Sequence, residues 1–297
     1  MRKIPIPAKI AAAVAAVGVA AAGSYALFSG HDRQAPRVQP AVPAQARTSP
    51  TVATSQAAPQ PITSVLTLLA ADEGRRACSS DNRWCVSLAK ETDDEGIRRP
   101  ILRRAGERIG AAGDEADPVD DVGADETYVV WPKLIVLGDG SFLAGVETRL
   151  STTYSGGGGS ATELRLFRVT RDGAAVGAPV LTLPVRASLL IRACFSEEDL
   201  EKRAEACHDE YGFTGQVGVE ASGSGTPPIT YATQAWAFPR GVSRDEDSTT
   251  RGPLVPADLV REPDKVCSFS RRFEFDDATK TYLPDRPLPD CSAYTVP

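Results

Sequence analysis

The chain has 297 residues, of which 42% are hydrophobic and 24% are charged. This composition is typical of a globular protein and excludes a wholly disordered chain, a collagen-like chain and a multi-span membrane protein. Lys and Arg number 33 against 39 Asp and Glu, which gives a formal net charge of -6. Because an acidic chain offers no broad basic surface to a phosphate backbone, we expect no nucleic acid among its partners.

Residues 1–28 have the pattern of an export signal. Three basic residues, Arg2, Lys3 and Lys9, precede an uncharged, alanine-rich run at residues 10–28. The secretion machinery recognises a positive segment followed by an apolar one. Two outcomes remain open, namely cleavage after Ala22 and retention of residues 10–28 as a helix in the inner membrane.

Residues 29–62 form a Pro/Ala-rich segment with six prolines and no hydrophobic periodicity, which predicts a disordered linker. A spacer is most useful to a tethered domain, so it favours the retained anchor. We therefore expect a domain at residues 63–297 in the periplasm, held at the inner membrane through residues 10–28. If the segment is cleaved, the domain is soluble in the periplasm or secreted.

All six cysteines lie beyond the export segment, and an even number in an oxidising compartment indicates disulfides. Each sequence-neighbour pair encloses a plausible local unit, so the sequence predicts the pairs Cys78 with Cys85, Cys194 with Cys207 and Cys267 with Cys291. A zinc site is not expected, because the chain has no C-x-x-C motif and only two histidines, His31 and His208. We expect no metal and no cofactor.

The hydrophobic pattern of the domain has mostly period two, with glycine, proline and Asp-Gly between the apolar runs. It predicts a mainly β domain, an antiparallel meander of the sandwich or propeller-like kind, with one short helix. Three hairpins are expected at 131–137 with 142–150, 163–170 with 179–185, and 268–275 with 281–283. Further strands are expected at 83–88, 188–192, 214–220 and 230–238.

The one helix is predicted to begin at Ser196, a good N-cap followed by three acidic residues. Leu200, Ala204, Cys207 and Tyr211 then fall at helical spacing on one face, which we expect to pack on the sheet.

The segment from Arg192 to Phe213, followed by Pro287–Cys291 and preceded by the alanine-rich and proline-rich regions, resembles uncharacterised exported cell-envelope proteins of Gram-negative bacteria. The resemblance covers residues 78–297. It implies an envelope location but no activity, because none is assigned to those proteins.

His208, Asp209 and Glu210 are the cluster that combines an imidazole with carboxylates, as a general base requires. Adjacent helical residues point in different directions, and the chain has no G-x-S-x-G nucleophile motif. A helix end with solvated acids is the structural alternative to a catalytic site.

Two other segments have both a binding and a purely structural interpretation. The glycine run at 154–161 contains G-x-G-x-x-A without the helix that a nucleotide fold requires, which leaves a flexible hairpin loop beside a binding face or a plain connection. The acidic stretch at 114–126 has enough oxygens for Ca²⁺ but lacks the EF-hand spacing, and a solvated loop is the alternative.

Aromatic residues provide the last group of candidates. Trp131, Tyr154 and Trp236 are candidate binding residues, with Trp84 a further possible stacking platform, although buried aromatics are more common in β proteins. Glu147 and Glu163 represent carboxylate-only chemistry of the glycosidase kind, which depends on their separation. The sequence thus predicts a non-catalytic envelope domain that binds an envelope protein or a glycan. The alternative is an envelope hydrolase that uses His208 and nearby acids.

Overall fold

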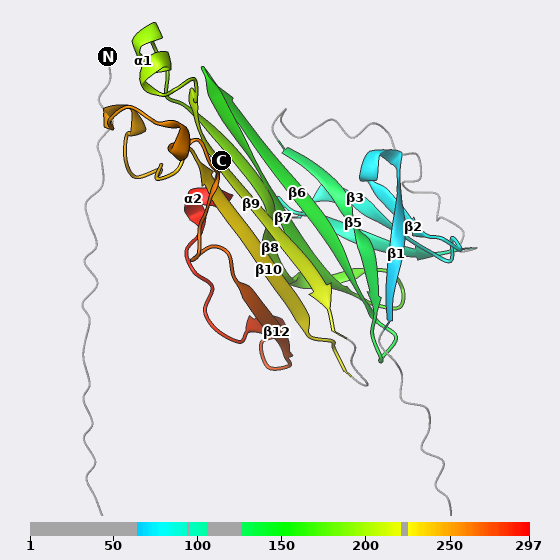
Figure 1. Ribbon diagram of the computed structural model, residues 1–297. Coiled ribbons are helices and arrows are strands. Elements are labelled where there is room, and N and C mark those ends of the chain that lie inside the picture. The colour runs from blue at the N-terminus through cyan, green and yellow to red at the C-terminus, as the bar shows by residue number, and fades with distance from the viewer. Residues whose placement is uncertain (1–63, 94–95, 106–125, 221–224) are drawn as a thin grey trace, which may run out of the picture. The chain divides into compact units, whose positions relative to one another are not determined.

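The computed structural model describes residues 64–93, 96–105, 126–220 and 225–297 (Figure 1). The predicted export segment at residues 1–28 and the linker at residues 29–62 lie outside the described residues, so both stay predictions. Among the described residues, no helix is long and apolar enough to cross a membrane.

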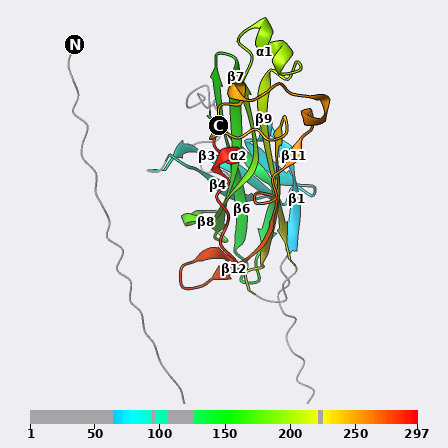
Figure 2. The same cartoon turned by 60° about the vertical axis from the view of Figure 1, so that its left-hand side comes forward.

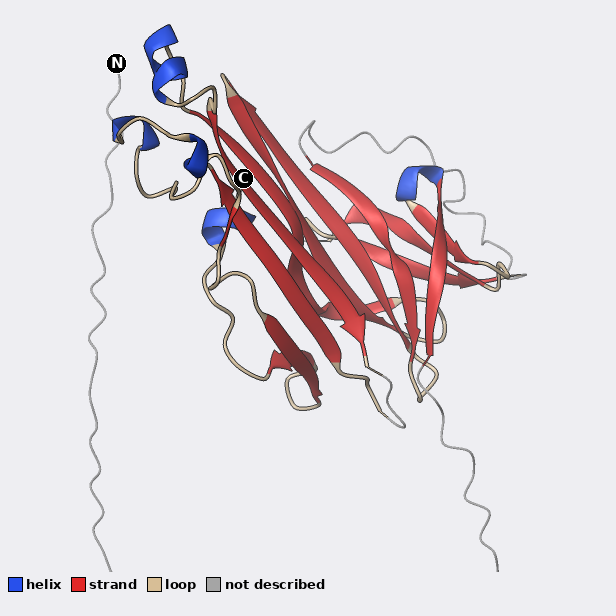
Figure 3. Cartoon of the chain, in the orientation of Figure 1, coloured by secondary structure: helices blue, strands red, loops and turns tan. Residues whose placement is uncertain are grey.

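Strands dominate the domain (Figure 3), and those of the described residues form one antiparallel sheet of thirteen strands. The strands are β1 (Ser64–Ala71), β2 (Arg76–Ser79), β3 (Trp84–Thr92), β4 (Arg98–Arg104), β5 (Glu126–Val136), β6 (Phe142–Tyr154), β7 (Gly157–Val169), β8 (Ala175–Arg192), β9 (His208–Val219), β10 (Ile229–Phe238), β11 (Glu262–Pro263), β12 (Ser270–Asp276) and β13 (Thr281–Pro284). The described part of the chain also contains three 3-10 turns and two short α-helices: η1 (Asp72–Gly74), η2 (Ser248–Thr250), η3 (Pro256–Asp258), α1 (Glu197–Lys202) and α2 (Ser292–Thr295). The predicted mainly β class is confirmed, with a second short helix, α2, that the sequence pattern did not indicate.

The strand order follows the chain over most of the sheet. β5 to β10 are consecutive neighbours, and β12 and β13 continue beyond β10. On the other side, Ser64–Thr67 of β1 pair with β5, whereas Leu68–Ala71 pair with β2. β1 therefore connects the long strands to the smaller group β2–β4, because it pairs with both β5 and β2. Helix α1 lies at one end of the long strands, and β12 lies toward the other (Figures 1 and 2).

The predicted hairpins are confirmed, and their turns have the expected chemistry. Between β5 and β6, the Leu137 N–H donates to the Ser141 carbonyl at 2.9 Å, and Gly140 adopts a φ of 79°. That left-handed conformation is accessible to glycine at little cost. The β7–β8 and β12–β13 hairpins also form, and the expected strand at 188–192 is the end of the long strand β8.

Within 154–161 only Ser155 and Gly156 form a turn, the tight connection between β6 and β7, and the other residues are strand, which corrects the loop expected over the whole segment. β7 begins at Gly157, and Gly157–Gly159 pair with β6 on one side while Gly158 and Gly159 pair with β8 on the other. A Cβ at Gly157 would overlap the Tyr154 ring. The glycines therefore permit close approach between neighbouring strands and side chains.

Helix α1 begins as predicted but is shorter. The Ser196 hydroxyl accepts from the Asp199 N–H at 3.1 Å, which confirms the N-cap. The helix ends at Lys202. The backbone then takes positive φ angles at Ala204 and Glu205, and β9 begins at His208. The expected apolar face at 200–211 therefore does not exist, because the chain reverses before a second full turn; Leu200 is 41% exposed.

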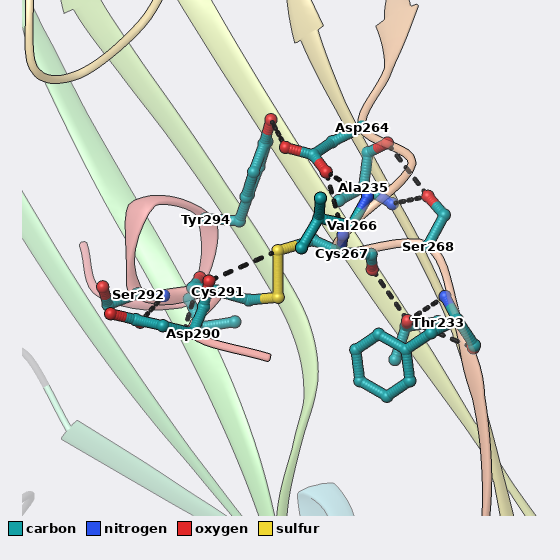
Figure 4. Close-up of a disulfide and its surroundings, with 12 residues drawn as sticks. Thr233, Ala235, Asp264, Val266, Cys267, Ser268, Asp290, Cys291, Ser292 and Tyr294 are labelled. Carbon is teal, nitrogen blue, oxygen red and sulfur yellow. Dashed lines mark hydrogen bonds between the residues drawn. A yellow bond between two sulfur atoms is a disulfide. The ribbon is translucent and has the colours of Figure 1, made fainter. Parts of the chain in front are cut away.

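All three predicted disulfides are present. The Cα–Cα distances are 4.0 Å for Cys78–Cys85, 4.9 Å for Cys194–Cys207 and 5.7 Å for Cys267–Cys291. Figure 4 shows the third bridge, which joins the segment before β12 to the start of α2. Disulfides of this kind are typical of an oxidising, extracytoplasmic compartment.

Hydrogen bonds anchor this third bridge to β10 and α2. Asp264 accepts from the Cys267 N–H at 2.8 Å and from the Tyr294 hydroxyl at 2.9 Å. The Thr233 hydroxyl donates to the Cys267 carbonyl at 2.7 Å (Figure 4). The C-terminal segment is thereby held against the sheet, where Tyr294 packs beside Tyr211.

Candidate functional site

The strand registers place fifteen residues of β6–β10 in three rows on one side of the sheet. Directly paired residues of antiparallel strands point to the same face, and successive residues alternate between faces. We call these residues the outer face. The rows are Arg149, Thr162, Arg186, Thr214, Gln234; Ser151, Ser160, Ser188, Gly212, Trp236; and Thr153, Gly158, Leu190, Glu210, Phe238.

The outer face is mainly polar and accessible; its apolar members are Leu190, which is 43% exposed, and the partly buried Trp236 and Phe238. Arg149, Arg186, Ser188, Thr214 and Gln234 are exposed, and most of the other members are half-buried between their neighbours. Hydroxyl groups from three adjacent strands lie side by side in the middle row, where the Ser160 and Ser188 oxygens are 3.3 Å apart. Such a surface can exchange hydrogen bonds with a ligand over several strands.

Trp236 lies at the β10 end of the middle row but is not a free stacking platform. A Cβ at Gly212 would overlap its indole, so the ring lies against the backbone of β9. The guanidinium carbon of Arg261 is 4.1 Å from the ring centroid, a cation–π contact. Arg261 also lies 3.8 Å from the Glu210 carboxylate.

A shallow depression of about 480 Å³ adjoins the third row of the outer face, at Glu210 and Phe238. Its walls include His208, Glu210, Phe238 and Leu259, together with the turn at 204–207. His208 and Glu210 are two residues apart on β9 and so lie on the same face. Two of the three clustered candidates thus share this depression.

Asp209, the third member of the cluster, points to the opposite side of the sheet and is buried. Its carboxylate lies 2.5 Å from the Arg203 guanidinium, and it accepts from the Ser248 hydroxyl. Arg203 also donates to the Ser248 oxygen at 3.0 Å and to the Ala206 carbonyl at 2.9 Å. This buried network ties α1, β9 and η2 together, so Asp209 is not available to assist His208.

The other aromatic candidates do not join this surface. Trp131 is 5% exposed and belongs to the main core cluster. Tyr154 is exposed, but it lies on the side opposite the outer face, where its hydroxyl donates to the Leu190 carbonyl at 2.6 Å. Trp84 packs on Phe142, with ring centroids 4.7 Å apart.

Glu147 and Glu163 cannot act as a carboxylate pair. Glu163 pairs with Thr148, the neighbour of Glu147, so the two acids point to opposite faces. Burial raises the pKa of the Glu147 carboxyl, an effect that the charge of Arg186 partly offsets. Glu163 forms an ion pair with Arg165 at 2.6 Å.

The acidic stretch at 114–126 lies outside the described residues except for Glu126, so its Ca²⁺ interpretation stays a prediction. Within the described part of the chain, no group of three or more His, Cys, Asp and Glu residues is arranged to hold a metal ion.

Comparison with protein-family models, with curated proteins and with solved structures found no match to this chain.

Arg149, Arg186 and the hydroxyl rows were not singled out from the sequence. Alternating polar residues in the predicted strands were the available signal, but only the register shows which of them are neighbours.

Proposed function

We propose that the protein is an exported, non-catalytic component of the cell envelope whose β domain binds an envelope glycan or protein through the outer face. The alignment of exposed arginine, hydroxyl and amide groups across five strands carries the proposal. A surface of this kind provides many hydrogen-bond donors and acceptors.

The three disulfides support export, since such bonds persist in oxidising compartments. A periplasmic domain tethered through residues 10–28, or released after cleavage, follows from the sequence pattern of the N-terminus. The resemblance to exported envelope proteins agrees with this location.

A sandwich, rather than a propeller-like stack, is the more economical description of the sheet. The main core cluster draws residues from β5–β8 and also from β9, β10, β12 and β13. Lys133 of β5 donates to the Val217 carbonyl of β9 at 3.0 Å, although these strands are not sheet neighbours. Both observations support two layers packed against each other.

An envelope hydrolase is the second candidate function, and the depression beside His208 and Glu210 is the observation in its favour. The buried pairing of Asp209 with Arg203 weakens it, because the imidazole then lacks an orienting carboxylate from its neighbour.

Site-specific photo-crosslinking of the full chain in its native envelope tests the proposal. A photoreactive amino acid at Ser188, on the outer face, should yield a discrete adduct that mass spectrometry identifies as a glycan or a protein. The control position is Thr182, which is exposed on the same strand but lies outside the outer face, so a photoreactive amino acid there should not yield this adduct. Equal adducts at both positions, or none at Ser188, would contradict binding through this face.

A further inference from the structure

We infer that the ligand of the outer face is an acidic glycan, whose carboxylates are bound by Arg149 and Arg186. This inference rests on the proposed function and specifies its ligand. It assigns the two arginines to anion recognition and the surrounding hydroxyl and amide groups to the sugar hydroxyls.

Arg149 and Arg186 lie in one row with Thr162 between them. Since adjacent strands are about 4.8 Å apart, the two arginine Cα atoms are separated by about 10 Å across β7. Both side chains are exposed on the same face. They are therefore placed to contact two anionic groups of one extended ligand.

Neither guanidinium has a hydrogen bond or a close ion pair among the described residues, although Arg186 lies within the electrostatic range of Glu147. Several other arginines of the domain form ion pairs. Arg165 contacts Glu163 at 2.6 Å, and Arg272 contacts Glu220 at 2.9 Å. Free guanidinium groups bind carboxylates through two parallel hydrogen bonds, so this pair gives an acidic protein a local surface for anions.

The surroundings favour a glycan over an acidic peptide. Around the arginines the rows contain mainly hydroxyl, amide and glycine positions, among them Ser160, Ser188 and Gln234. Peptides are usually recognised at sheet edges or in apolar grooves, and an open polar sheet face provides neither. Sugar hydroxyls, in contrast, can donate to and accept from such side chains.

The length of the surface favours an oligomer. Five adjacent strands span about 19 Å from β6 to β10. A single small anion would contact one arginine and leave most of the rows unused. A polymer with repeated carboxylates contacts both arginines and the hydroxyl row at once.

Binding of oligogalacturonate, a carboxylated glycan, to the purified full chain in neutral detergent tests the inference. Dextran of similar length is the neutral control, and poly-glutamate is the peptide control. The double variant Arg149→Gln/Arg186→Gln should weaken oligogalacturonate binding at least about tenfold, because two charge-assisted contacts are lost. The double variant Lys90→Gln/Lys280→Gln removes the same charge at exposed positions on β3 and beside β13, and should change the affinity less than about twofold.

Three results would overturn the inference: no binding of oligogalacturonate, equal losses in both double variants, or poly-glutamate binding that is as strong and as dependent on the two arginines. Crosslinking from Ser188 without oligogalacturonate binding leaves the proposed function intact and rejects only the acidic glycan. Absence of the Ser188 adduct rejects the proposed function itself.

Discussion

Replacing Asp209 by alanine should destabilise the fold strongly, because the carboxylate is the buried partner of Arg203. The two side chains are only 6% and 5% exposed, respectively. Asp209→Ala removes the ionic contact at 2.5 Å and also the acceptor of the Ser248 hydroxyl. Arg203 then keeps its contacts with Ser248 and the Ala206 carbonyl, but its charge has no counter-ion inside the protein.

Removing one partner of a buried ion pair costs about 3–5 kcal/mol of unfolding free energy. That loss is a large share of the about 5–15 kcal/mol by which domains are stable. Replacing both partners, as in Arg203→Met/Asp209→Leu, should cost much less than the sum of the two single changes, because no charge stays buried.

These changes in unfolding free energy are measured by urea denaturation at neutral pH with the disulfides intact, monitored by circular dichroism. Lys280→Met is the control, because it breaks an ion pair in which both side chains are exposed, with Lys280 at 3.1 Å from Asp277. The unfolding free energy of this variant should stay close to that of the parent protein. A cost below about 1 kcal/mol for Asp209→Ala, or strictly additive losses in the double variant, would refute the reasoning.

Three further changes probe other parts of the structure. Replacing Cys267 and Cys291 by alanine opens a loop of sequence separation 24 and should lower the unfolding free energy by about 3 kcal/mol, measured by urea titration. Gly212→Ala should cost about 1–3 kcal/mol and shift the tryptophan fluorescence, because the new methyl group overlaps the Trp236 indole. Glu147→Gln should raise stability at pH 7 but not near pH 3: burial raises the pKa of the parent carboxyl, so its ionisation opposes folding as the pH rises.

Matched variants make these three outcomes specific. Replacing Cys78 and Cys85, with a sequence separation of 7, should cost about 2 kcal/mol, less than the longer loop, and the reverse order would contradict the loop argument. Gly252→Ala meets no atom within 4 Å and should leave the fluorescence unchanged. Glu163→Gln, which breaks an ion pair, should not stabilise the domain at pH 7.

Local signals predicted the parts of the fold that depend on neighbouring residues. The β5–β6 hairpin followed from two period-two runs around Gly138–Ser141, and the Ser196 cap followed from its acidic neighbours. The disulfides followed because each pair closes a short segment. In each case the stabilising contact lies within a few tens of residues along the chain.

β4 illustrates what local signals miss. Its sequence, Arg98–Arg104, contains four arginines and Pro100, a composition that is unfavourable for a central strand. The strand lies at the end of the sheet order, where a proline is tolerated. Its place depends on β3 and on buried residues such as Leu102, which packs with β5 and β6.

The sequence analysis expected the helix to continue through residues 203–211, whereas the structure has a strand from His208 onward, and this difference changes the candidate site. On a helix, His208, Asp209 and Glu210 would have pointed in three directions; on β9 they alternate between the two faces. Tertiary contacts enforce the strand, since β9 pairs with both β8 and β10 along this segment. The same pairing aligns Arg186 with Thr214, which no sequence pattern could have indicated.

The buried Asp209–Arg203 pair and the Cys267–Cys291 bridge lie away from the exposed side chains of the outer face. Asp209 and Arg203 form their network on the opposite side of β9, and the Cys267–Cys291 bridge holds α2 against the core beside Tyr294. Side chains such as Ser188 and Arg186 are exposed and contribute little burial. Exposed substitutions of this kind usually change stability by less than about 0.5 kcal/mol. Variants of the exposed side chains, such as Arg149→Gln/Arg186→Gln, therefore test ligand binding with little change in stability, unlike Gly212→Ala in the same face.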